Sequence, residues 1–472
     1  MPCRTKLVCT LGPATATSAA IRALAEAGTD VFRVNLSHGE ALQHAELVRL
    51  VRATSEELGH ELAVMADLPG PKVRLGEVVP EPLHLEAGSR FVLRASAGAG
   101  DVEGATTTYP GLAGDVQRGD RILLSDGAVE LTVVRTEGTN VVTEVLRAGR
   151  VRSGAGVNVP AERLGLPAIT ERDRDGLRRA LDVGVDLVAQ SFVRDASDVI
   201  GLRALMGSRL VPIVAKIETR PAVDDFADVL GRADAVMVAR GDLGVELPME
   251  EIPILQKELL RAARAAGKPA IVATQMLESM THAPRPTRAE ATDVANAVLD
   301  GTDAIMLSGE TAIGEYPAEA VRAAVRIAEV AEGSATRFRL EREPCTHTDE
   351  AAAVAHAAAQ IATADRSVVA IACFTGTGRT AALLSSERPP VPIYAFVPEP
   401  GVLRALGLRW GVRALAAHEP ADTDEMIAMM DEGLRMAGLA GPGQSVVMAA
   451  SSPAGKAHTN MLKVHHIGEA VR

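Results

Sequence analysis

The stretch VPIVAKIETRPAVDDFADVLGRADAVMVARGD, residues 211–242, holds two short apolar runs that each end in charged residues. The first run, Val211–Lys216, is followed by Glu218, and the second, Ala235–Ala239, is followed by Arg240 and Asp242. Short apolar runs without alternation are typical of strands that are buried on both faces, as in a parallel sheet. The stretch therefore predicts two neighbouring strands that bring charged side chains to one end of a buried sheet.

The same rhythm continues on both sides of this stretch. Further strand candidates are Lys6–Thr10, Val31–Val34, Leu62–Ala66, Leu187–Gln190, Ala270–Ala273 and Ala304–Leu307. The amphipathic stretches between the candidates include Ser18–Ala27, Glu40–Leu58, Arg172–Val183, Ile254–Ala266 and Pro317–Ala331. This alternation predicts an α/β fold, a (β/α)8 TIM barrel, because right-handed crossovers place the helices outside the strands. An open doubly wound sheet has the same alternation and is the alternative.

Two regions depart from the rhythm. From Val73 to about Leu166 there is no helical period, and short segments alternate instead: Arg121–Leu124, Val129–Val134 and Asn140–Val145. This pattern predicts a small β-domain inserted in a barrel loop, where insertions are tolerated over the active-site face. After a polar passage at Glu341–Pro344, helix and strand patterns resume and predict a separate C-terminal α/β domain.

The predicted divisions are residues 1–70 and 167–338 for the barrel, 71–166 for the insert and 339–472 for the C-terminal domain.

Composition excludes several classes of protein. The net charge of -12 argues against a nucleic-acid partner. The sequence has no run of 18 apolar residues, so no membrane partner is expected. Four scattered cysteines show neither metal-ligand spacing nor a disulfide framework, which favours a cytoplasmic location.

Polar residues follow most of the predicted strands in one register. They are Arg33, Asn35 and Ser37; Asp67; Lys216 and Glu218; Arg240 and Asp242; Thr274 and Met276; and Ser308 and Glu310. Any one of them alone would more often be a helix cap or a surface charge. Together they converge on the carboxyl ends of the strands, where barrel active sites lie.

The residue types in this set favour phosphoryl transfer. Glu218 and Asp242 suit a hard divalent cation, and Lys216 beside them can neutralise charge that develops on an oxygen. Arg33 and Arg74 can bind phosphate or carboxylate with two hydrogen bonds. Metal, lysine and arginine together are typical of enzymes whose catalysis rests on positioning and charge neutralisation.

Several ordered motifs make the chain resemble the pyruvate kinase family almost from end to end. They are TKLVCTLGP (5–13), RVNLSHG (33–39), DLPGPKVR (67–74), AKIE (215–218), VARGDLGVE (238–246), ATQMLESM (273–280) and MLSGETA (306–312). The family's small β-barrel lid and its C-terminal regulatory domain fall where the two extra domains are predicted. The resemblance also implies a homotetramer.

The resemblance implies a role for each matching residue. Arg33 would bind the phosphate of phosphoenolpyruvate, and Glu218 and Asp242 would hold Mg²⁺, with Mn²⁺ as the alternative ion. The substrate carboxylate would lie against the Gly241 and Asp242 amides and Thr274. Lys216 would stabilise the transition state. Protonation of the enolate would proceed near Thr274, Ser308 and Glu310. The residues implied for ADP are Asn35, Leu36, Ser37, His38, Arg74 and Arg172.

Three departures from the family's pattern carry further predictions. K⁺-dependent members have Glu where this chain has Lys72, so activity should not require K⁺. The cation-like site implied around that lysine consists of Asn35, Ser37, Asp67 and Lys72. Gly165 and Arg172 replace the family's usual Asp and Lys where the lid meets the nucleotide, so ADP binding could differ.

In the C-terminal domain, a glycine-rich turn precedes a helical run and consists of Thr375, Gly376, Thr377, Gly378, Arg379 and Thr380. It is either an ordinary strand–helix turn or, as the resemblance implies, the loop for a phosphorylated allosteric effector. Two rival functions stay open: another Mg²⁺-dependent barrel enzyme acting on phosphoenolpyruvate or a pyruvate enolate, such as an aldolase, and a catalytically inactive relative that senses metabolites.

Overall fold

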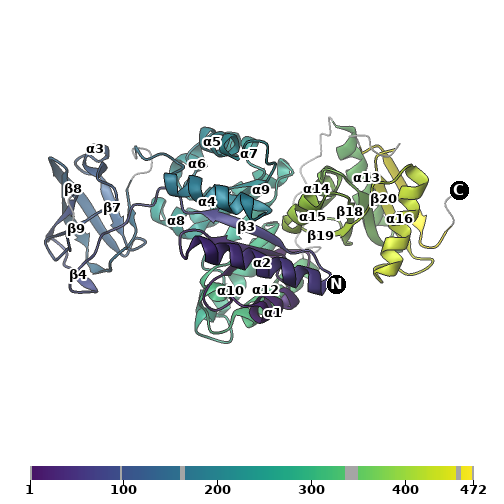
Figure 1. The fold of residues 1–472 in the computed structure, drawn as a ribbon, viewed down its shortest axis with the longest axis horizontal. Helices are drawn as coiled ribbons and strands as arrows, with labels where there is room; N and C mark the ends of the chain where they lie inside the picture. The colour runs from purple at the N-terminus through teal and green to yellow at the C-terminus, as the bar shows by residue number, and fades with distance from the viewer. Residues whose placement is uncertain (1–2, 96–97, 160–164, 335–348, 453–458, 470–472) are drawn as a thin grey trace.

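The computed structural model describes residues 3–95, 98–159, 165–334, 349–452 and 459–469. Three lobes lie in a row, with the inserted domain at one end, the barrel in the centre and the C-terminal domain at the other end (Figure 1). The predicted linker Glu341–Pro344 lies outside the described residues.

The central lobe is a closed eight-stranded parallel barrel, so the TIM-barrel prediction is confirmed and the open sheet is excluded. Its strands, in the order in which they pair around the barrel, are β1 (Lys6–Leu11), β16 (Ala304–Leu307), β15 (Ala270–Ala273), β14 (Ala235–Ala239), β13 (Ile213–Ile217), β12 (Leu187–Gln190), β3 (Ala63–Leu68) and β2 (Val31–Asn35).

Helices surround this barrel. They are α1 (Ser18–Ala27), α2 (Ala41–Leu58), α4 (Glu171–Asp182), α5 (Ala196–Met206), α6 (Arg220–Asp224), α7 (Phe226–Arg232), α8 (Arg240–Glu246), α9 (Ile252–Ala265), α10 (Arg288–Leu299), α11 (Gly309–Ala312) and α12 (Pro317–Ser334), with a 3-10 turn η2 (Glu278–Thr281). Side-chain caps begin several of them: Thr17 accepts a hydrogen bond from the Ala20 amide at α1, and Thr170 and Asp173 form a capping box at α4.

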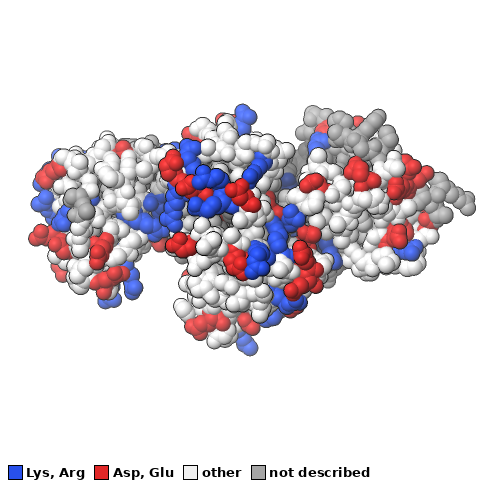
Figure 2. All heavy atoms as spheres, viewed as in Figure 1, with Lys and Arg blue, Asp and Glu red and all other residues white. Residues whose placement is uncertain are grey.

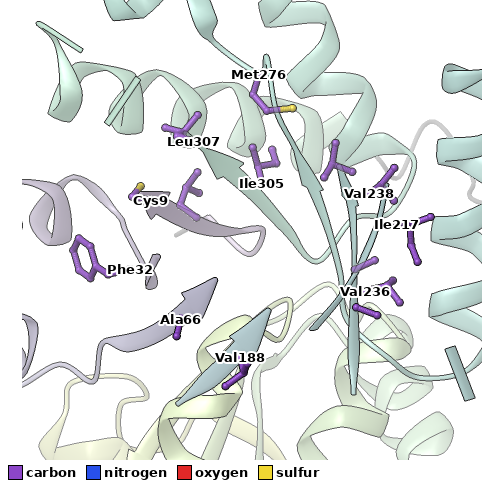
Figure 3. Close-up of a cluster of buried hydrophobic side chains, with 14 of the residues drawn as sticks. Cys9, Phe32, Ala66, Val188, Ile217, Val236, Val238, Met276, Ile305 and Leu307 are labelled. Atoms are coloured by element: carbon purple, nitrogen blue, oxygen red, sulfur yellow. The ribbon is translucent and has the colours of Figure 1, made fainter. Parts of the chain in front are cut away.

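Alternate residues of each barrel strand face opposite ways and form two cores. The inward set includes Val8, Val31, Met65, Ala189 and Val214, which pack together inside the barrel. The outward set packs under the helices, and Figure 3 shows part of it: Cys9, Phe32, Ala66, Val188, Val236 and Leu307.

Two residues after each of these inward-facing residues, the same register places a polar side chain. These side chains are Thr10, Arg33, Asp67, Ser191 and Lys216. The buried apolar interior therefore directs these groups to one mouth of the barrel.

The inserted domain is built mainly of β-strands around its own apolar core of residues between Val73 and Val159, as predicted. A six-stranded sheet has the order β11 (Val157–Asn158), β7 (Arg121–Leu124), β8 (Val129–Glu137), β9 (Asn140–Arg147), β5 (Arg90–Arg94) and β6 (Gly104–Thr106). β4 (Leu83–Leu85) and β10 (Gly149–Val151) form a second, two-stranded sheet, and a short helix α3 spans Leu112–Asp115.

The C-terminal domain is a five-stranded sheet between helices. The sheet order is β19 (Val412–Ala416), β18 (Ile393–Val397), β17 (Val368–Phe374), β20 (Ser445–Ala450) and the antiparallel edge strand β21 (Met461–His466). Its helices are α13 (Glu350–Ala364), α14 (Arg379–Ser386), α15 (Pro400–Ala405) and α16 (Thr423–Met436), with a 3-10 turn η3 (Leu406–Leu408).

Two ion pairs between half-buried arginines and buried aspartates join the C-terminal domain to the barrel: Arg404 binds Asp186 at 2.7 Å, and Arg388 binds Asp303 at 3.1 Å. None of the helices among the described residues is long and apolar enough to cross a membrane.

Candidate active site

A buried lysine occupies the centre of the barrel mouth. The Lys216 Nζ atom lies 2.7 Å from the Ser191 hydroxyl, 2.8 Å from Glu218 Oε1 and 3.3 Å from Asp67 Oδ1. These three partners match the three N–H donors of an ammonium group. Lys216 is therefore held in one position at the end of β13.

The charges in this cluster support one another. Burial acts to lower the pKa of Lys216, but Asp67 and Glu218 together raise it above its ordinary value. Burial likewise acts to raise the pKa of Asp67, but Lys216 and Arg33 outweigh it and hold that pKa below its ordinary value. Lys216 thus stays protonated and Asp67 ionised at neutral pH.

Arg33 is fixed beside the lysine. Its Nε donates to Asp67 Oδ2 at 2.6 Å, and its Nη1 donates to the Thr10 hydroxyl at 3.0 Å. Within the described ranges its Nη2 makes no hydrogen bond to the protein. A guanidinium held on one edge in this way can present its other edge to an oxyanion.

The residues present fit a divalent cation. Burial raises the pKa of Glu218, and the negative charge of Asp242 acts in the same direction, against the lowering effect of Lys216. Each has a lysine neighbour: Glu218 has Lys216 at 2.8 Å, and Asp242 has Lys72 at 3.0 Å. The described part of the chain contains no cluster of three or more His, Cys, Asp or Glu side chains arranged to hold a metal, so Glu218 and Asp242 would be the only protein carboxylates of such a site there. Two oxygen ligands alone leave open positions for substrate and water, as Mg²⁺ prefers.

The cation-like site expected around Lys72 stays a prediction, and the structure shows which groups this lysine contacts. No hydrogen bond or ion pair joins Lys72 to Asn35, Ser37 or Asp67 among the described residues. Asp67 is already occupied by Arg33 and Lys216, so the Lys72 ammonium pairs instead with Asp242. The Phe192 ring centroid lies 5.9 Å away from its Nζ.

The turn after β15 has an unusual backbone. Thr274 and Gln275 have φ angles of 69° and 55°, a region that a β-branched residue such as threonine rarely adopts. Arg240 donates to the Thr274 carbonyl at 2.8 Å and pairs with Asp293 at 2.7 Å. The Thr274 hydroxyl accepts the Gly241 amide at 2.7 Å, so three of the residues expected to hold the substrate carboxylate (Gly241, Asp242 and Thr274) lie together.

Both oxygens of the Glu310 carboxylate are held by backbone hydrogen bonds. Its two carboxylate oxygens accept the backbone amides of Leu277 at 3.0 Å and Ser308 at 2.7 Å. These bonds tie the turn after β15 to the end of β16. The structure thus gives Glu310 a positioning contact, while Ser308 continues the inward register of β16.

Residues 35–38, which are expected on the nucleotide side, lie against Arg172 of α4. Arg172 donates to the Ser37 carbonyl at 2.8 Å, and the Asn35 side chain accepts the Ser37 amide at 3.0 Å. Burial and the charges of Arg74, Arg172 and Arg33 lower the pKa of His38, so its imidazole is neutral at pH 7. Figure 2 shows Lys and Arg side chains gathered where the inserted domain meets the barrel. Arg74 has a different partner from Arg172, because it donates a hydrogen bond to the Gly154 carbonyl in the inserted domain at 3.0 Å.

Gly165 takes part in a contact at the base of the inserted domain. Its amide donates to Asp115 Oδ2 at 2.8 Å, and the Tyr109 hydroxyl donates to the same oxygen at 2.5 Å. This bond to Asp115, together with burial, raises the pKa of Tyr109 to about 12. A Cβ atom at position 165 would lie 3.4 Å from Asp115 Oδ2. The family's usual aspartate would therefore place a second carboxylate beside Asp115.

We expect Gly165→Asp to destabilise the chain by about 1 kcal/mol, the repulsion of two exposed charges about 4 Å apart. Adding Asp115→Asn should restore stability because one charge is removed. Thermal unfolding of the single and double variants measures both effects. Equal transition temperatures for Gly165→Asp and the unaltered chain would contradict this account.

Hydrogen bonds and an ion pair hold the glycine-rich turn of the C-terminal domain in place. The Thr375 hydroxyl accepts the Gly378 amide at 3.0 Å, and the Thr380 hydroxyl shares a hydrogen bond of 2.7 Å with Thr459. Arg379 pairs with Asp349. Gly376 and Thr377 remain exposed before α14.

The sequence alone did not identify Ser191 and Phe192, which directly follow β12, as residues of the site. Ser191 bridges Lys216 and Asp67, at 2.7 Å and 3.3 Å, and the Phe192 amide donates to Glu218 Oε2 at 2.7 Å. Phe192 has a φ of 53°. The signal was present, because Ser191 follows Ala189 by two residues in the inward register.

Comparisons with known proteins match both the barrel and the C-terminal domain. The family model "Pyruvate kinase, barrel domain" matches residues 3–321, and "Pyruvate kinase, alpha/beta domain" matches residues 352–465. Relatives that carry the name pyruvate kinase include the following three. The one from Mycobacterium tuberculosis (strain ATCC 25618 / H37Rv) is 43% identical over 472 residues, 99% of both chains. The one from Corynebacterium efficiens is 41% identical over 473 residues, again 99% of both chains. The one from Geobacillus stearothermophilus is 41% identical over 478 residues, 99% of this chain and 81% of that protein.

Two matched domains and identity along the full length show that this chain belongs to the pyruvate kinase family of phosphotransferases.

Proposed function

We propose that this chain transfers the phosphoryl group of phosphoenolpyruvate to ADP at the barrel mouth, giving pyruvate and ATP in glycolysis. The observation that carries the proposal is the buried Lys216 ammonium, held between Asp67, Ser191 and Glu218 beside Arg33. A fixed cation of this kind stabilises an enolate oxygen without reorganisation during the reaction.

In this proposal the free edge of Arg33 binds the phosphate. The bond between phosphorus and the enol oxygen breaks as a terminal oxygen of ADP bonds to phosphorus, and the electron pair stays on the enol oxygen. Lys216 neutralises that oxygen, and a proton delivered to the adjacent carbon near Thr274 and Ser308 completes pyruvate. Glu218 and Asp242 would hold a divalent ion, which supplies Lewis-acid charge to substrate oxygens. The inserted domain, residues 71–166, acts as a lid that excludes water.

Pyruvate formation that depends on both phosphoenolpyruvate and ADP, coupled to ATP production, tests the proposal. An aldolase-type enzyme would consume phosphoenolpyruvate or pyruvate without making ATP. A metabolite sensor would bind phosphoenolpyruvate without turnover. Either outcome would overturn the proposed reaction.

We further propose that activity does not require K⁺. The support is that Lys72 places a fixed ammonium at the mouth, 3.0 Å from Asp242. The positive charge of this lysine can replace the positive charge of a bound monovalent ion. Turnover in buffer free of K⁺ and Na⁺ should then be close to its value in added K⁺, and a strong activation by K⁺ would contradict the idea.

Lys72→Glu should lower turnover in K⁺-free buffer by about 10- to 100-fold, since a lost charge-assisted contact is worth about 1.5–3 kcal/mol. Added K⁺ should recover part of this loss, because the new carboxylate beside Asp242 needs a counter-ion. Steady-state kinetics with and without K⁺ measure both effects. The surface variant Lys257→Glu is the control and should show no new response to K⁺.

The remaining proposals concern regulation and assembly. The turn of residues 375–380 would take a phosphorylated effector, supported by its exposed Gly376 and Thr377 before α14. Its identity is open to a screen of sugar phosphates and nucleotides. On the basis of the family, we also propose a homotetramer, a cytoplasmic location and domain divisions at residues 71–166 and 339–472.

A further inference from the structure

A cavity of about 500 Å³ lies on the flank of the barrel, between α2 and α4. The two helices lie side by side, with β3 beneath them (Figure 1). The lining residues that decide its chemistry are Val34, Leu36, Ala45, Val48, Arg172 and Arg179. The residues Arg33, Lys216 and Thr274 do not line it, whereas Leu36 and Arg172, which are expected on the nucleotide side, lie at its edge.

Small residues on the facing helices leave this space open. Ala45 lies on α2, and Gly176 and Ala180 lie on α4, so no large side chain fills the gap between the helices. Val34 and Ala66, from β2 and β3, form the floor with their outward-facing side chains. The floor of the cavity is therefore apolar.

The rim of the cavity carries two arginines and two carboxylates, and most of these charges already have partners. Asp182 is paired with Arg209 at 2.8 Å, and Glu40 is engaged in the capping box that begins α2. Arg172 and Arg179 belong to the same helix, and Arg179 makes no hydrogen bond or ion pair through its side chain within the residues that the structure describes. Figure 2 shows Lys and Arg side chains gathered over α4.

We propose that this cavity binds a small molecule with a flat apolar body and one anionic group, such as an aromatic carboxylate or sulfonate. The body would fill the space between α2 and α4, and the anion would pair with Arg179. Pockets of this volume with an apolar interior and a few polar groups at the rim suit ligands of this size.

The proposed ligand would also influence nucleotide binding. Leu36 lines the cavity and belongs to the nucleotide segment, and Arg172 bonds to the carbonyl of Ser37 at 2.8 Å. An ideal Cβ atom at Gly176 would lie 3.3 Å from the Leu36 side chain, so α4 and this segment are in close contact. This coupling rests on the proposed function, whereas binding itself does not.

The test uses 8-anilino-1-naphthalenesulfonate as the probe and the full chain as the protein. Titration calorimetry should give one saturable site. Arg179→Ala should weaken that site about tenfold, since a charge-assisted contact is lost. Ala45→Phe should abolish binding, because the ring fills the cavity. Arg178→Ala is the matched control: Arg178 lies on the same helix, pairs with Asp175 and does not line the cavity, so binding should be unchanged.

Binding that survives Ala45→Phe would overturn the proposal, because the probe would then lie elsewhere. Full displacement of the probe by ADP would also overturn it, since the cavity would then be part of the nucleotide site. A rise or fall in the KM for ADP in the presence of the probe, lost in Ala45→Phe, would support the coupling. Absence of pyruvate formation would defeat the proposed function and leave the binding result standing.

Discussion

Lys216→Met should reduce the turnover number for phosphoryl transfer by at least about a thousandfold, a loss typical when a charge that stabilises the transition state is removed. Methionine has a similar length and no charge, so the enolate oxygen would form without its cation. Substrate affinity should change far less than kcat, because Arg33 still holds the phosphate.

The fold of this variant can be checked independently. Far-UV circular dichroism and thermal unfolding should show an intact barrel, since the apolar layers inside the strands are unchanged. Lys257→Met, at a lysine that pairs with Asp300 on the surface, is the matched control and should keep full activity. Retention of more than a tenth of the activity in Lys216→Met would remove the central element of the proposed mechanism.

Glu218→Gln should reduce turnover by about 10²–10³-fold, and saturating Mg²⁺ should not restore it. An amide is a weaker ligand than a carboxylate for a hard cation. The change also removes the 2.8 Å ion pair with Lys216, so two parts of the site are affected together.

Mn²⁺ binding separates these two effects. Electron paramagnetic resonance should show Mn²⁺ affinity reduced in Glu218→Gln and unchanged in Lys216→Met, if Glu218 is a metal ligand. Glu250→Gln, on the exposed surface, is the control and should bind Mn²⁺ as the unaltered chain does. Unchanged Mn²⁺ affinity in Glu218→Gln would exclude it as a ligand.

The barrel was predictable because its interior is repetitive. A buried parallel strand must be apolar on both faces, so Ala235–Ala239 and Ala304–Leu307 are bounded in the sequence as they are in the structure. The polar side chains that follow in the inward register, such as Lys216 after Val214, could be assigned to the mouth by alternation alone. The edge strands β19 and β21 carry mixed exposure and gave no comparable signal.

The partner of each charge was not predictable in the same way. Alternation brings Lys72 near the mouth but does not decide between Asp67 and Asp242. The outcome depends on competition, because Arg33 and Lys216 already occupy both oxygens of Asp67. Ser191 escaped notice since a serine after a strand is common, and only the distances to Lys216 and Asp67 distinguish it.

The left-handed backbone of Thr274 and Gln275 has a consequence for protein engineering. Two adjacent residues in this region cost of order 1–3 kcal/mol each, and glycine would relieve that cost. A selection for thermal resistance alone would therefore favour Thr274→Gly, yet the same change would remove the hydroxyl that meets the Gly241 amide. Heat tolerance and catalysis impose opposite demands at this position, and libraries screened only for melting temperature would accumulate inactive proteins.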